Sequence, residues 1–184
     1  MKSTSRQILT ELRDDHRNLA VILGLLEETA ATTKAGDDPD LLLIEEIMRY
    51  MMVYVDAVHH PKEDLIFAEL QTHRPDLAEG LDDVPEDHWL IAALGTRLRS
   101  DVDAIIAGAA VRREQLIADI RQYVQRLRSH MLWEEDDLFP RVDKMIADDS
   151  HGITLGDSLR IKDPVFEPEI ESAFRRVMAG LQDR

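Results

Sequence analysis

Apolar residues recur in steps of three and four along most of this chain, and that spacing constrains the fold more than any other feature. Such steps place side chains on one face of an α-helix, whereas a strand would need simple alternation. The pattern predicts four long helices, at about residues 3–35, 39–70, 84–108 and 109–140. Because the connections between them are short, we expect an up-down-up-down four-helix bundle in the all-α class.

The C-terminal part of the chain has a different character. Residues 148–163 are polar and contain glycine, which indicates a loose connection, and residues 164–181 again show an amphipathic helical pattern. We therefore expect a bundle over residues 1–147, followed by a linker and an additional short C-terminal helix, packed on the bundle, over residues 148–184.

Composition excludes several classes of function. The chain of 184 residues has a net charge of −15, which argues against nucleic acid and anionic membranes as partners. It has no cysteine, so a metal ion would have to be bound by histidine, carboxylate or backbone groups. Neither a membrane-spanning run nor the apolar part of a signal peptide occurs, and a cytoplasmic location is the default expectation.

Histidine and glutamate occur at helix positions that should otherwise be apolar. His16 and His88 each interrupt an apolar face, and the spacing His-x-x-x-Glu occurs at two places. On a helix this spacing aims one imidazole and one carboxylate in the same direction. The two pairs are His59 with Glu63 and His130 with Glu134.

Distances along the helices predict that these six side chains meet. His16 and His59 each lie about twenty residues, or roughly 30 Å, from the turn between the first two helices. His88 and His130 each lie twenty-one residues from residue 109, in the second turn. Buried polar groups are costly unless they are paired or bound to a metal. Six ligands, two of them carboxylates that can bridge, suit two ions of iron, zinc or manganese with positions left open.

These residues resemble the hemerythrin-like, or HHE cation-binding, family over about residues 8–145. The motifs are Asp15-His16-Arg17, His59-His60-Pro61-Lys62-Glu63-Asp64, Glu86-Asp87-His88 and His130-x-x-x-Glu134-Glu135-x-x-Leu138-Phe139-Pro140. The resemblance implies an oxo- or hydroxo-bridged centre of two iron ions, for which zinc or manganese can substitute. Its ligands would be His16, His59, Glu63, His88, His130 and Glu134.

The chain departs from oxygen-carrying hemerythrins at two positions. Those proteins have a further histidine where this chain has Ala92, and their spacing after the last histidine would select Glu135 in place of Glu134. The four-histidine set is more similar to the iron–sulfur repair proteins of the family, although their N-terminal cysteine-bearing segment is absent. His60 is a further candidate, either supporting a ligand or replacing His59 if Pro61 kinks the helix.

Other residues are expected to have structural roles. Trp89, Trp133, Phe67 and Phe139 are predicted to pack between helices, and His73 and His151 to face solvent. A dense group on the second helix is predicted to be core, with a gas channel and a hydrogen bond from Tyr54 as the alternative. This group comprises Met48, Tyr50, Met51, Met52 and Tyr54.

Three functions agree with this sequence. The first is a di-iron protein that binds or senses O₂ or NO, or handles iron under redox stress. The second is a di-iron enzyme of the oxidase, peroxidase or NO reductase type, with Tyr54 or His60 as proton donor. The third is an iron store or regulatory module that contacts a protein partner, or a second copy, through the apolar face of residues 164–181. The sequence does not decide whether the protein is an enzyme.

Overall fold

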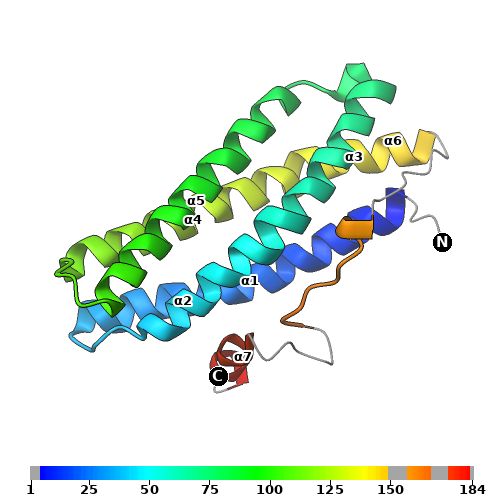
Figure 1. Ribbon diagram of the computed structural model, residues 1–184. Coiled ribbons are helices and arrows are strands. Elements are labelled where there is room, and N and C mark those ends of the chain that lie inside the picture. The colour runs from blue at the N-terminus through cyan, green and yellow to red at the C-terminus, as the bar shows by residue number, and fades with distance from the viewer. Residues whose placement is uncertain (1–4, 149–156, 167–173, 183–184) are drawn as a thin grey trace.

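Four long helical segments form an antiparallel bundle, with a short helix beside it (Figure 1). The structure is a computed structural model that describes residues 5–148, 157–166 and 174–182. It confirms the predicted all-α bundle with an additional short C-terminal helix. Among the described residues, no helix is both long enough and apolar enough to cross a membrane.

The segments follow the predicted order. The first is α1 (Ser5–Ala35). The second joins α2 (Leu41–Tyr50), the π-helix η1 (Met51–His59) and α3 (His60–His73). The third is α4 (Val84–Ile106), preceded by two 3₁₀ turns, η2 (Pro75–Leu77) and η3 (Leu81–Asp83). The fourth joins α5 (Arg113–Trp133), the π-helix η4 (Glu134–Leu138) and α6 (Phe139–Asp148), and is followed by the 3₁₀ turn η5 (Asp157–Leu159) and by α7 (Arg175–Gln182).

A polar layer divides the apolar core into two parts. Along α1, Leu12 belongs to one buried cluster and Leu19 to the other, with His16 between them. The same division occurs along the second segment, where Glu63 lies between Val58 of the larger cluster and Ile66 of the smaller one. The apolar periodicity therefore builds the bundle, and the polar residues that interrupt it share one level.

Both π-helices lie at this polar layer, and each comes just before a proline. The backbone N–H of His60 bonds to the carbonyl oxygen of Val55, five residues earlier, and Phe139 bonds to Glu134 in the same way. Wide turns of this kind often occur at functional sites. The expected irregularity at Pro61 is therefore a π-helical stretch. The fourth helix, predicted to extend to about residue 140, continues through Pro140 as α6 to Asp148, after the π-helical stretch η4.

The C-terminal segment packs on α1 and α2 through its apolar residues (Figure 1). Val165, Phe174 and Val177 are buried, and Phe174 makes an edge-on contact with Tyr50. The Tyr50 hydroxyl donates a hydrogen bond to Asp163 at 2.9 Å. Val165, Phe174 and Val177 thus belong to the larger core cluster, and the partner contact suggested for the apolar face of residues 164–181 stays a prediction. Residues 167–173 of that predicted helix lie outside the described residues.

We expect Asp163→Ala to destabilise the protein by about 1–3 kcal/mol, because buried partners would lose their acceptor. Asp163 is buried and accepts hydrogen bonds from the Tyr50 hydroxyl, the Asn18 amide and the Val165 backbone. Urea denaturation measures the change. Asp103→Ala is the control, since this exposed carboxylate lies 3.7 Å from Arg99 and should matter little. Equal stability of the two variants would contradict the prediction.

Candidate metal centre

The structure brings all six predicted side chains together in the polar layer, and all six are buried. Glu63 lies among three of the histidines. Its Oε1 is 3.2 Å from Nε2 of His16 and 3.0 Å from Nε2 of His59, and its Oε2 is 3.4 Å from Nε2 of His88. A single carboxylate thus contacts side chains from α1, from its own helical segment and from α4.

Glu134 has a matching position on the fourth segment. Its Oε2 lies 3.4 Å from Nε2 of His16 and 3.3 Å from Nε2 of His130. The Nε2 atoms of His88 and His130 are 3.1 Å apart and face one another. Each glutamate therefore reaches histidines from both helical hairpins, as the sequence led us to expect of carboxylates that bridge two ions.

Two groups of side chains have the spacing needed to bind an ion, and Glu63 belongs to both. The first group is His16, His59 and Glu63, and the second is His60, Glu63, His88 and His130. Within each group, the candidate ligand atoms all lie within 4.8 Å of one another. Glu134 contacts one histidine of each group. Each of the two groups could hold a metal ion, and they meet at Glu63.

His60 enters the layer beside His59 and does not replace it. Its ring is buried and stacks on that of His88, with centroids 4.1 Å apart and planes inclined by 11°. A π turn holds more residues than an α turn, so consecutive side chains diverge less. This local widening at Met51–His59 explains how two neighbouring histidines both point inward.

Glu135 lies at the edge of the layer. Its side chain is 33% exposed, and its Oε1 is 2.9 Å from Nδ1 of His16, on the side of the ring away from Glu63. Glu134 has no exposed side-chain area and faces inward. The structure therefore places Glu134 among the candidate ligands and Glu135 where it can orient His16.

In three further histidines, Nδ1, the ring nitrogen that faces away from the centre of the polar layer, lies close to a carboxylate. The Nδ1 atoms of His59, His88 and His130 lie 3.1, 3.1 and 2.9 Å from Asp15, Asp64 and Asp87, respectively. Carboxylates in this position orient a metal-binding imidazole and increase its basicity. Sequence reasoning missed this role, although each aspartate adjoins a predicted ligand in the chain. Nδ1 of His60 likewise lies 3.5 Å from a carboxylate, that of Asp56.

The hydroxyl of Tyr54 is engaged outside the histidine cluster. It donates to both oxygens of Asp15 at 3.0 Å, and Nζ of the buried Lys62 lies 4.0 Å from Asp15. Tyr54 is itself buried, as are Met48, Tyr50 and Met51 of the same predicted group, while Met52 is half-buried. Packing is therefore the role that the structure supports for this group.

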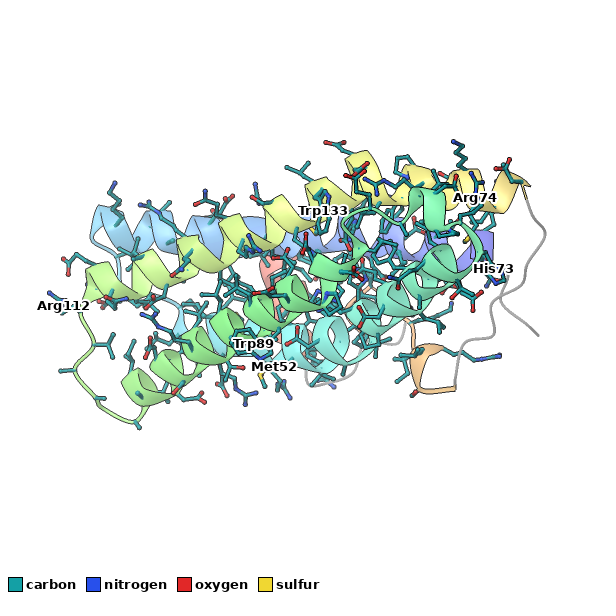
Figure 2. The ribbon with its side chains drawn as sticks, turned by 90° about the horizontal axis from the view of Figure 1, so that it is seen from above. Met52, His73, Arg74, Trp89, Arg112 and Trp133 are labelled. Atoms are coloured by element: carbon teal, nitrogen blue, oxygen red, sulfur yellow. The ribbon has the colours of Figure 1, made fainter. Side chains whose placement is uncertain are left out.

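Of the four aromatic residues predicted to pack between helices, three pack against the core and one does not. Phe67 and Phe139 are buried, and Trp133 is half-buried. Trp89 is wrong: it is 70% exposed and projects from α4 (Figure 2). His73 is exposed at the end of α3, as predicted, and His151 lies outside the described residues.

Burial and neighbouring carboxylates set the charge of the layer when no metal is bound. Burial lowers the pKa of His16, but Glu134, Glu135 and Glu63 outweigh it and raise that pKa to about 11. Carboxylates likewise outweigh burial at His88 and His59, where the pKa values are about 10 and 9. Burial lowers the pKa of His60 and of His130. Protons on His16, His88 and His59 thus balance the negative charge of the carboxylates. A metal ion would compete with these protons for the imidazoles.

Several buried atoms in the layer lack an aligned hydrogen bond among the described residues. They are both carboxylate oxygens of Glu134, Oε2 of Glu63 and Nε2 of His60. Leaving such atoms unpaired is costly, and a bound cation would satisfy all of them. Nitrogen and oxygen donors of these types suit divalent iron, zinc and manganese. The residues present therefore fit a metal centre.

These features define a four-helix bundle with a candidate centre for divalent metal ions. The family model described as hemerythrin HHE cation binding domain matches residues 7–153. The chain belongs to this family, and the resemblance expected over residues 8–145 is confirmed. Searches of curated proteins and of solved structures found no match.

Proposed function

We propose that this protein binds two iron ions in the polar layer and uses them to bind or sense O₂ or NO. The observation that carries the proposal is the sharing of Glu63 between two groups of buried ligands. His16 and His59 would bind one ion, and His60, His88 and His130 the other, with Glu63 and Glu134 between them. Bound iron would supply redox chemistry and affinity for a diatomic ligand.

The protein itself would bind, orient and shield the ions. Glu63 and Glu134 have no exposed side-chain area, and the apolar clusters on both sides of the layer keep it away from bulk water. Five histidines and two shared carboxylates do not fill the coordination of two six-coordinate ions. Positions therefore remain for a small ligand.

Binding or sensing is favoured over turnover by the state of the two candidate proton donors. The Tyr54 hydroxyl is hydrogen-bonded to Asp15, and His60 stacks on His88 within the second ligand group. The Tyr54 hydroxyl thus already donates to Asp15, and His60 would bind an ion, so neither group would donate a proton to a bound molecule. A regulatory role through the C-terminal helix has less support, because Val177 already packs in the core.

A gas titration of the iron-loaded protein tests this proposal. The protein would be reduced without oxygen, exposed to NO or O₂, and followed by visible absorption and product analysis. We expect new charge-transfer bands that are saturated stoichiometrically, without continuing consumption of the gas. Sustained consumption of NO or O₂ would assign the enzyme role, and an absent spectral response would refute the binding of these gases.

A further inference from the structure

A groove between α1 and α5 leads from the surface to His16. It has a volume of about 550 Å³ and is bordered on α1 by Arg13, His16, Arg17 and Ala20. On the facing side, Arg128, Met131 and Leu132 of α5 and Glu135 of η4 complete the lining. On each side, successive lining residues are three, one and three positions apart, so one continuous face of each helical segment forms the wall.

The charge of this groove is opposite to that of the whole protein. Three arginines and one glutamate line it, in a chain whose net charge is −15. A second hollow that reaches the polar layer, at His130, is lined by Asp83, Glu86 and Asp87 with only Arg126 as a cation. Basic side chains around a groove attract anions and raise their local concentration. Of the two hollows, the one at His16 is therefore the one suited to an anion.

The three arginines have donors to spare. Arg17 pairs with Asp14, Arg128 lies 2.8 Å from Glu27, and Arg13 lies 2.8 Å from Asp143. None of these three carboxylates lines the groove, and Glu135, which does, lies 3.6 Å from Arg13. Exposed pairs of this kind are weak, and each guanidinium carries five N–H donors. The side chains of Arg17 and Arg128 are 70% and 41% exposed, so both are accessible to a ligand.

The lining also includes an apolar part that a simple inorganic ion would not use. Met131 is buried, whereas Leu132 is 61% exposed and accessible to a ligand. The groove is far larger than a diatomic molecule, since one water occupies about 30 Å³, and its volume is in the range of small-molecule sites. Size, apolar surface and basic charge together fit a small organic anion.

We propose that this groove binds a small organic carboxylate, with its charged end on Arg17 and Arg128 and its apolar part on Met131 and Leu132. A ligand there would lie against His16 and Glu135, and His16 is 3.2 Å from Glu63. The groove would thus be a second binding site, for a different class of ligand, in direct contact with the polar layer. This proposal goes beyond the proposed function, because anion binding itself requires no metal.

Titration of the full-length protein with sodium benzoate, followed by two-dimensional ¹H–¹⁵N NMR, tests the proposal. We expect saturable shifts in the backbone amides of residues 13–20 and 128–135. Benzyl alcohol lacks the charge and formate lacks the apolar part, so each should bind at least about fivefold more weakly. Shifts confined to other parts of the chain, or no saturable shift, would overturn the proposal.

A double variant then tests the role of the arginines. Arg17→Gln with Arg128→Gln should weaken benzoate binding by about fivefold or more, because both charges facing the carboxylate are removed. Arg97→Gln is the control, since Arg97 is 55% exposed and lies 3.0 Å from Asp119, away from the groove. Equal affinity in the double variant and the control would overturn the proposal. Metal content, measured on the same samples, separates this result from the proposed function.

Discussion

Replacing Glu63 with glutamine is expected to remove most of the bound metal and to weaken affinity by more than about 100-fold. Glu63 belongs to both ligand groups, and its two oxygens lie 3.0–3.4 Å from histidines of three helical segments. An amide of nearly the same size keeps the volume but loses the negative charge that two cations require. Both ions should therefore be lost together. Anaerobic loading, desalting and elemental analysis measure the effect.

Glu69→Gln provides a matched control for this variant. Glu69 lies on the same helix, α3, but its side chain is 36% exposed and pairs with His73 at the surface. The control should retain the metal content of the unmodified protein. Circular dichroism of both variants shows whether the bundle is intact. A folded Glu63→Gln protein with its full metal content would mean that Glu63 does not link the two positions.

Phe139→Ala is expected to reduce the free energy of unfolding by about 3–5 kcal/mol, the range for removing a buried aromatic ring. Phe139 has no exposed area, and its ring stacks on that of His16 with centroids 5.2 Å apart. The ring also contacts that of Phe67 in the core. The variant would leave a cavity, and the ring of the candidate ligand His16 would lose the packing on one face. Urea denaturation of the metal-free protein isolates the packing effect.

Phe166→Ala controls for the loss of an aromatic ring without the loss of core. Phe166 is 37% exposed and belongs to the C-terminal segment, so we expect a loss of less than about 1 kcal/mol. If Phe139→Ala were as mild as this control, the packing of the ring against His16 would not contribute to stability. Because this comparison uses metal-free protein, it reports on stability alone. The metal affinity of both variants can then be measured separately.

The helices and the level of the polar layer could be predicted from sequence because both depend on simple distances along the chain. Steps of three and four placed Leu12 and Leu19 in the core, and both are fully buried. Equal counts of residues from each turn placed His16 level with His59, and their rings are 5.1 Å apart. Such counting works where helices are long and connections are short.

The finer arrangement of the layer depends on features that periodicity does not contain. The π turn before Pro61 brings His60 inward beside His59, whereas the sequence left open whether His60 supports a ligand or replaces His59. The pairing of Asp64 with His88 depends on side chains from two segments meeting in space. Trp89 is the next residue after the inward-facing His88, and each residue of an α-helix is rotated by about 100° from the one before. The side chain of Trp89 therefore lies on the outside of the bundle despite its apolar ring.

The number of iron ions bound by each chain tests the central claim most directly. The full-length protein would be loaded with ferrous iron without oxygen, desalted, and analysed for iron and protein together. The two ligand groups that share Glu63 predict about two irons per chain. One ion per chain, or none, would contradict a two-metal centre in this layer.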